Sequence, residues 1–122
     1  MRKAYDAFNA GDLDALGELF ADDIVFHSPG TSAISGDFRG KDAVFGHFGQ
    51  VDELTGNTLR AELHDVLAND EHVVALHTDR GEREGKGSYD NKAGVVAHIR
   101  DGKIAEVWSH VLDSKAEEEF FA

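Results

Sequence analysis

Apolar residues in the first twenty positions recur with helical spacing in two segments. In residues 2–9, Tyr5 and Phe8 lie on one stripe of a helix. Gly11 follows at a position where a left-handed residue commonly ends a helix, and Asp12 has a side chain suited to cap the next one. The apolar positions of that second segment are Leu13, Leu16, Leu19 and Phe20. The pattern predicts two short helices at the start of the chain.

The next residues change from helical to extended character. Ile24 to His27 is β-branched and aromatic, and Pro29, the single proline of the chain, is expected to end that strand. Residues 31–40 are rich in Gly and Ser and are interpreted as a loop. Residues 41–51 regain helical spacing, which predicts a third helix with an aromatic face.

From Thr58 onward, apolar and polar residues alternate with the period of a β-strand. The predicted strands run from residue 58 to a turn at 68–70, from 72 to about 84, from 88 to 100, and from 103 to about 113. Asp101-Gly102 predicts a tight hairpin turn, because glycine readily adopts a positive φ. Residues 114–122 are expected to form a short acidic helix or a loosely held tail, and the run Glu117–Glu119 is interpreted as solvated charge.

Together these elements predict a single domain over residues 1–122. The expected fold class is α+β, a cone-shaped barrel in which three N-terminal helices pack on one strongly curved antiparallel sheet. A sheet of this shape leaves a concavity with an open mouth, and small ligands are usually bound in such concavities.

Alternation along the strands sorts their residues into two faces. The face expected to meet the helices comprises Phe26, Ser28, Val74, Leu76, Thr78, Val95, Ala97, Ile99, Val107, Ser109 and Val111. The opposite face comprises His27, Val73, Ala75, His77, Val96, His98, Trp108 and His110. The second face of an antiparallel sheet is often wet or pairs with another subunit. We therefore favour a homodimer interface on this outer face, anchored by Trp108.

The net charge of the chain excludes some classes of binding partner. Twenty-four acidic and twelve basic residues give a net charge of −12, which repels nucleic acid and anionic membrane surfaces, so neither is expected as a partner. The absence of cysteine excludes disulfides and catalysis by a thiolate. Apolar runs are too short to span a membrane, and the first residues lack the pattern of a secretory signal. A cytoplasmic location is the expectation.

Four segments carry a resemblance to a known family: Tyr5–Asp12, Phe26–Gly30, Phe38–Asp42 and Asp101–Trp108. They resemble the SnoaL-like polyketide cyclase family, within the nuclear transport factor 2-like and ketosteroid isomerase-like superfamily. The resemblance covers nearly the whole chain and implies the cone-shaped fold. It implies no single reaction, because the superfamily hosts isomerases, polyketide cyclases, epoxide hydrolases, transport factors and proteins with no known chemistry.

Three positions depart from the catalytic patterns of that superfamily. Ser28 stands where the resemblance to ketosteroid isomerases implies a general-base aspartate, and Ser109 stands where cyclases and epoxide hydrolases carry an aspartate. The oxyanion-hole tyrosine of the isomerases aligns with Ala4, which leaves Tyr5 one position away, about 100° around the helix. The resemblance therefore transfers neither activity to this chain.

The seven histidines leave alternatives open. Besides the outer interface, a β-bulge beside an active site would turn His27 and His110 inward, where His27 would act as a general base near neutral pH. A third alternative places four strand imidazoles around a transition metal, but the spacing gives it little support. His47, His64 and His72 are interpreted as solvated surface residues.

These observations define a set of candidate residues. The catalytic candidates are His27, Ser28, Ser109 and His110, and the ligand-binding candidates are Tyr5, Phe8, Phe26, Phe45, Phe48, Leu76, Val95, Val107 and Trp108. No metal or other cofactor is expected. The sequence favours a small-molecule-binding domain that performs acid–base chemistry, such as isomerisation, cyclisation or dehydration, on an apolar carbonyl-containing substrate. The alternative is a non-catalytic ligand-binding or dimerisation module of the same fold.

Overall fold

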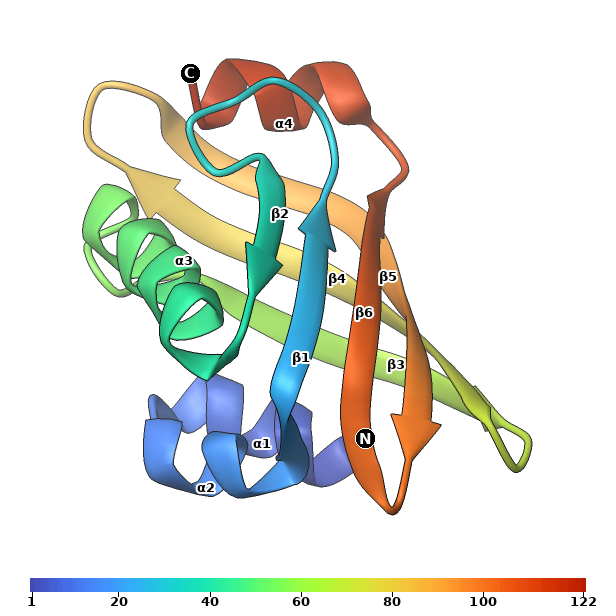
Figure 1. The fold of residues 1–122 in the computed structure, drawn as a ribbon. Helices are drawn as coiled ribbons and strands as arrows, with labels where there is room; N and C mark the ends of the chain where they lie inside the picture. The colour runs from blue at the N-terminus through green and yellow to red at the C-terminus, as the bar shows by residue number, and fades with distance from the viewer.

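A computed structural model of the chain describes residues 1–122. The protein has an α+β fold in which helices pack on a single sheet (Figure 1). The elements in chain order are α1 (Arg2–Ala10), α2 (Leu13–Leu19), β1 (Phe20–Ser28), β2 (Gly36–Arg39), α3 (Lys41–Leu54), β3 (Arg60–Ala68), β4 (His72–Arg83), β5 (Gly87–Arg100), β6 (Lys103–Val111) and α4 (Ser114–Phe120). None of these helices is both long enough and apolar enough to cross a membrane.

The six strands form one sheet in the order β2-β1-β6-β5-β4-β3. Neighbouring strands are antiparallel except β1 and β6, which are parallel. The expectation of a purely antiparallel sheet is therefore wrong at this pair, which brings together distant parts of the chain without a hairpin. The sheet is also open, with β2 and β3 at its two edges, so it forms a curved layer and not a closed barrel.

Strand β2 lies within the stretch that the sequence predicted as a loop. It has only four residues and pairs on one side, with β1, from Val25↔Arg39 to Ser28↔Gly36. Four residues are too few to show the apolar–polar alternation of a strand, and an edge strand buries little apolar surface. The pairing supplied by β1 decides its conformation.

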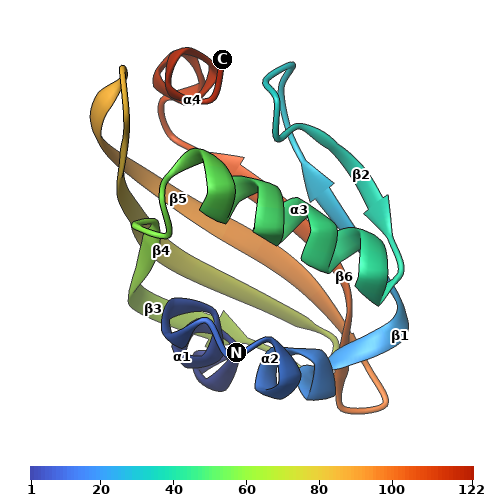
Figure 2. The same ribbon diagram turned by 90° about the vertical axis from the view of Figure 1, so that its left-hand side faces the viewer.

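The helices enclose the concave side of the sheet. Figure 2 shows α1, α2 and α3 on one side of the curved strands, with α4 at the far end from α1 and α2. The tail is helical: Asp113 caps α4 by accepting a hydrogen bond from the Ala116 backbone N–H at 3.0 Å. The backbone N–H groups of Thr31 and Ala33 bind Glu118 and the Phe121 carbonyl, which docks α4 on the β1–β2 loop.

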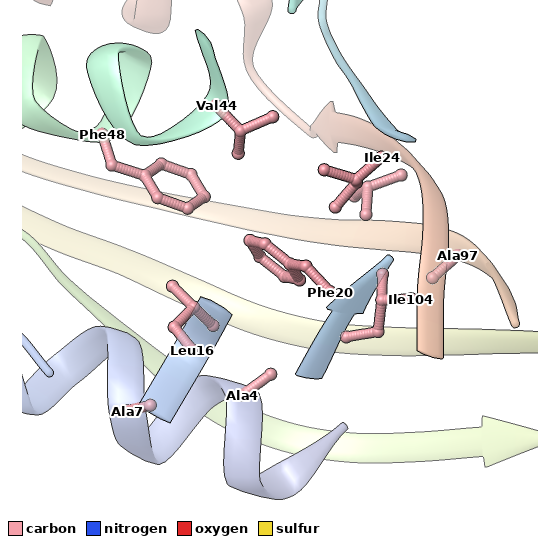
Figure 3. Close-up of a cluster of buried hydrophobic side chains, with 10 residues drawn as sticks. Ala4, Ala7, Leu16, Phe20, Ile24, Val44, Phe48, Ala97 and Ile104 are labelled. Atoms are coloured by element: carbon pink, nitrogen blue, oxygen red, sulfur yellow. The ribbon is translucent and has the colours of Figure 1, made fainter. Parts of the chain in front are cut away.

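The main core fills the space between α1, α2, α3 and the sheet (Figure 3). Ile24 and Val44 are fully buried there, and Leu16 and Phe48 pack beside them from the helical stripes that the sequence predicted. A second cluster lies under α4. It comprises Ile34, Val51, Leu59, Tyr89, Phe120 and Phe121. The two clusters hold α4 and the three earlier helices around one concavity.

The predicted inner and outer faces hold for β1, β5 and β6 over the residues that line this concavity, but not for β4. Ala75 is paired with Val95 and Val73 with Ala97, and all four are on the helix side. Leu76 lies on the outer face, 45% exposed. Residues 73–76 are apolar on both faces, so their alternation does not distinguish inside from outside. The pairing with β5 sets the direction of the side chains.

Candidate functional site

The helices and the concave face of the sheet surround a cavity of about 150 Å³. Sixteen of its 22 lining residues are hydrophobic. An apolar cavity of about this volume holds a molecule as large as benzene in another protein. The concavity is therefore large enough for a small apolar molecule.

A chain of hydrogen bonds crosses this apolar wall. The Tyr5 hydroxyl lies 2.6 Å from Nδ1 of His77, and Nε2 of His77 lies 3.0 Å from Oδ1 of Asp79. Because an ionised Asp79 can only accept, Nε2 of the neutral imidazole carries the proton, and the Tyr5 hydroxyl donates to Nδ1. Burial, and secondarily the charge of Asp79, raise the pKa of Tyr5 above its ordinary value, so Tyr5 remains a neutral hydrogen-bond donor.

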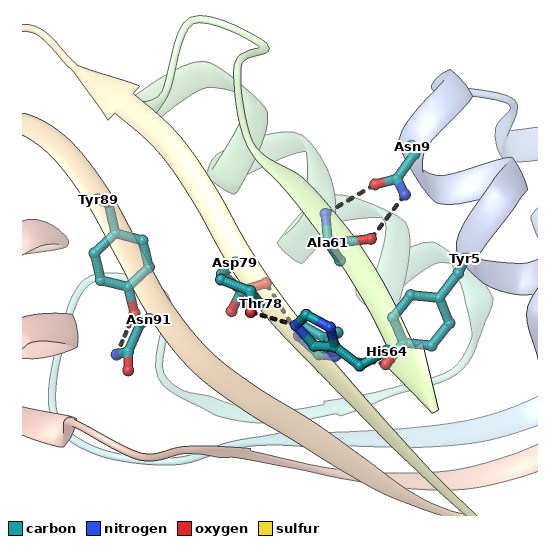
Figure 4. Close-up of polar contacts among 9 residues, drawn as sticks. Tyr5, Asn9, Ala61, His64, Thr78, Asp79, Tyr89 and Asn91 are labelled. Carbon is teal, nitrogen blue, oxygen red and sulfur yellow. Dashed lines mark hydrogen bonds and ion pairs between the residues drawn. The ribbon is translucent and has the colours of Figure 1, made fainter. Parts of the chain in front are cut away.

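Local structure accounts for the position of this chain. His77 and Asp79 are two residues apart on β4, so their side chains share one face of the strand. On α1, the side-chain amide of Asn9 makes two hydrogen bonds with the backbone of Ala61 on β3 (Figure 4). Its Nδ2 donates to the Ala61 carbonyl at 2.8 Å, and its Oδ1 accepts from the Ala61 N–H at 2.9 Å. Tyr5 lies one helical turn before this anchor. The two bonds hold α1 against β3 at a register that directs Tyr5 toward His77.

The other end of the cavity is lined by α4 and by the ends of β1 and β6. Ser28 and Ser109 come from these neighbouring parallel strands, and Glu117 and Phe121 come from α4. Glu117 is only 6% exposed. Burial, followed by the charges of Asp79 and Glu118, raises the pKa of its carboxyl to about 7. Near neutral pH this carboxyl is therefore present in both its protonated and its ionised form.

Most of the candidate residues predicted from the sequence line the cavity. They are Tyr5, Phe8, Phe26, Ser28, Phe48, Val95, Val107 and Ser109. Five others do not: His27, Phe45, Leu76, Trp108 and His110. Phe45 stacks on Phe20 behind the lining, with ring centroids 6.0 Å apart, and Leu76 and His110 line a groove on the outer face.

The structure confirms the predicted outer-face position of His27 and contradicts the alternative in which a bulge turns it inward. Its Nδ1 lies 2.6 Å from Asp37 and its Nε2 lies 2.5 Å from Glu106, and its ring stacks on Trp108. The hydrogen bonds to Glu106 and then to Asp37 raise the pKa of His27. The irregularity in the β1–β6 pairing falls between Phe20 and Val25, before His27, and does not turn the ring inward. His27 is therefore not available as a base inside the cavity.

The alternative of a metal held by strand imidazoles has no geometric basis in the structure. His77 faces the cavity, whereas His27 and His110 face the other side of the sheet. No group of three or more His, Cys, Asp or Glu side chains is arranged to hold a metal ion.

Four polar cavity residues were missed by the sequence interpretation: His47, His77, Asp79 and Glu117. His77 was assigned to the outer face with Val73 and Ala75, and His47 to the surface. His47 is instead buried against the rings of Phe26 and Phe38, and burial lowers its pKa to about 4.

Glu117 had a signal in the sequence. It lies three residues before Phe120 and four before Phe121, a spacing that places all three on one face of a helix. The run Glu117–Glu119 was instead interpreted as solvated charge. Considering Phe120 and Phe121 as helix positions would have placed Glu117 on the buried side.

The comparisons with known proteins agree with this architecture. Bal32a, from a soil-derived mobile gene cassette, is 37% identical, with a TM-score of 0.95 over 99% of this chain and 92% of its own. A nuclear transport factor 2-like protein of unknown function from Burkholderia pseudomallei is 21% identical, with a TM-score of 0.89 over 99% of this chain and 93% of its own. The fold is thus of the nuclear transport factor 2-like class.

Sequence comparison gives the family. The model of the SnoaL-like domain matches residues 1–107. An uncharacterized protein of Mycobacterium tuberculosis is 33% identical over 123 aligned positions, which cover 100% of this chain and 93% of that protein. The chain belongs to the SnoaL-like family.

Proposed function

We propose that this protein is an acid–base enzyme that binds a small, apolar, carbonyl-containing molecule in its cavity and catalyses an isomerisation, cyclisation or dehydration. The observation that carries the proposal is the hydrogen-bonded chain Tyr5–His77–Asp79 in a cavity whose lining is otherwise mostly apolar. Titratable groups held in an apolar pocket by such partners are characteristic of catalytic sites.

The hydrogen-bonded residues Tyr5, His77 and Asp79 are suited to stabilise negative charge on a carbonyl oxygen of the ligand. While His77 is neutral, the single proton of the Tyr5 hydroxyl is donated to Nδ1 of His77 and is not available to a ligand carbonyl. When His77 takes up a second proton, Nδ1–H donates to the Tyr5 oxygen, and the Tyr5 proton is then directed at the ligand. Asp79 stabilises the imidazolium that results. The proton that leaves the neighbouring carbon passes to solvent water, and the enolate that remains is stabilised by the Tyr5 hydroxyl in a low-dielectric environment.

The proposal can be tested without knowing the natural substrate, by measuring hydrogen exchange at the carbon next to the carbonyl group of simple ketones. Cyclopentanone and cyclohexanone are incubated with the protein in D₂O, and the loss of their α-proton signals is followed by NMR. We expect the wild-type protein to exceed the buffer rate. Tyr5→Phe should reduce the excess by about a hundredfold, the usual cost of removing one oxyanion donor. His77→Gln should reduce it similarly.

The matched control is His27→Gln, which alters a histidine outside the cavity and should leave the exchange rate unchanged. Circular dichroism verifies that each variant is folded. An excess rate that survives both Tyr5→Phe and His77→Gln refutes the proposed chemistry. No excess rate with either ketone favours the alternative, a non-catalytic ligand-binding module, which the serines at positions 28 and 109 also support.

We further propose that the protein forms a homodimer through the outer face of the sheet. An open groove of about 590 Å³ runs there, lined in part by Leu76 and Leu112, which is 79% exposed. No Asp or Glu lines the groove, although the chain has a net charge of −12. Two copies can approach there with little repulsion. Leu76 takes the anchoring role expected of Trp108, whose ring stacks on His27.

Substituting Leu76→Glu should convert this dimer to a monomer, because it introduces a charge into an apolar contact. Size-exclusion chromatography with light scattering measures the mass at micromolar protein concentration. Leu13→Glu, at a similarly exposed leucine on α2 away from the groove, should leave the mass unchanged. A monomeric wild-type protein would contradict the interface.

A further inference from the structure

Glu117 is a buried carboxyl group without a partner. It is 94% buried and lines the cavity, and no hydrogen bond or positive charge lowers the pKa of its carboxyl. Buried carboxylates in proteins are normally paired with a donor or a cation. The Glu117 carboxylate lacks a donor or cation within the protein, so we look for its partner in a ligand that enters the cavity.

Asp79 adds a second carboxylate to the same cavity. Asp79 lines the cavity, and its charge acts on both Glu117 at the α4 end and Tyr5 at the other end. No lysine or arginine side chain lines the cavity, and the neighbouring Glu118 adds further negative charge. Nε2 of His77 donates a hydrogen bond to Asp79, but no donor or cation of the protein lowers the pKa of Glu117. The end of the cavity near α4 has an excess of negative charge.

The apolar part of the lining also suits a cation. Phe121 follows Glu117 by one turn of α4 and lines the cavity with Phe8, Phe26 and Phe48. Aromatic faces attract an ammonium group, most strongly where water is excluded. Carboxylates and aromatic rings thus offer complementary contacts to a positively charged nitrogen on an apolar body.

We propose that the α4 end of the cavity binds the ammonium group of a small apolar amine, with Glu117 as its principal acceptor and Asp79 as the second negative charge. This deepens the proposed function, on which it rests only in taking the cavity as the ligand site. The substrate then carries its amine toward α4 and its carbonyl toward Tyr5. An amine completes the charge balance of the site whether or not Tyr5 and His77 promote proton exchange.

The test compares two probes of nearly equal size, benzylamine, which is cationic at neutral pH, and benzyl alcohol, which is neutral. Isothermal titration calorimetry gives the two dissociation constants for the wild-type protein. We expect benzylamine to bind at least about tenfold more tightly, since it supplies the missing cation. Glu117→Gln keeps the shape of the side chain and should abolish this preference, leaving the binding of benzyl alcohol unchanged or improved.

Glu119→Gln is the matched control. It removes the same charge two residues away, from an exposed side chain on the same helix, and should retain the preference. A non-specific attraction of the amine to the acidic protein would instead weaken equally in both variants, and that result overturns the proposal. Equal or tighter binding of benzyl alcohol by the wild-type protein, or no binding of either probe, also overturns it. Ketone exchange is measured separately, so each proposal can fail while the other holds.

Discussion

Replacing Phe121 by alanine is expected to lower the free energy of unfolding by about 3–5 kcal/mol, the usual range for a large buried aromatic residue. Phe121 is 2% exposed, packs edge-on against Phe120 with ring centroids 4.9 Å apart, and contacts Tyr89. Its loss leaves a void beneath α4 that rigid neighbours cannot fill. Urea unfolding at one fixed protein concentration measures the change.

The matched control for this prediction is Leu67→Ala. Leu67 is 53% exposed on the edge strand β3, and its truncation should cost less than about 1 kcal/mol. Because Phe121 also lines the cavity, Phe121→Ala should weaken ligand binding even where the protein remains folded. A cost for Phe121→Ala no larger than that for Leu67→Ala would mean that α4 is not docked as described.

Replacing Glu117 by glutamine is expected to stabilise the protein above pH 7 by on the order of 2–3 kcal/mol, because a pKa raised from 4.5 to about 7 disfavours ionisation in the folded state. The folded protein binds this proton more tightly than the unfolded chain does. Stability from this residue is therefore present below pH 4.5 and is lost as the pH rises through about 7. Unfolding by urea across this pH range measures the difference between variant and wild type.

The difference between the two proteins is the decisive quantity, since other groups titrate in the same range. It should be near zero below pH 4.5, where Glu117 is protonated and resembles glutamine, and should grow with pH. Glu119→Gln should show no such pH dependence. A Glu117→Gln protein that is less stable than wild type at high pH would indicate an unrecognised favourable partner for the carboxylate. A buried carboxyl that lowers the stability of the folded protein, yet lines the cavity, fits the trade of stability for function seen at functional sites.

Much of the fold follows from local pattern. The stripes through Tyr5, Leu16 and Phe48 predicted three helices and their buried faces, and the Asp101-Gly102 turn marked the hairpin between β5 and β6. These features depend on residues within a few positions of one another, so the chain alone reveals them. The same holds for eight of the residues that line the cavity.

Features that depend on distant partners were predicted less well. The parallel pairing of β1 with β6 joins residues about eighty positions apart, and nothing in either strand specifies the direction of its neighbour. In β4, residues 73–76 are apolar on both faces, so only the register with β5 turned His77 inward. His27 has the sequence context of a catalytic base, but Asp37 and Glu106 hold it on the outer face.

The chemistry of the candidate site was settled by these long-range contacts. Helical and strand periodicity predicted the α+β fold class and a concavity, and composition excluded disulfides and thiolate catalysis, because each is a property of near neighbours or of composition. The meeting of Tyr5 with His77, and the docking of α4 on the β1–β2 loop, join segments more than seventy residues apart. Such contacts form only when the sheet curves and α4 closes against it. The polar groups that face a ligand are therefore a property of the folded chain.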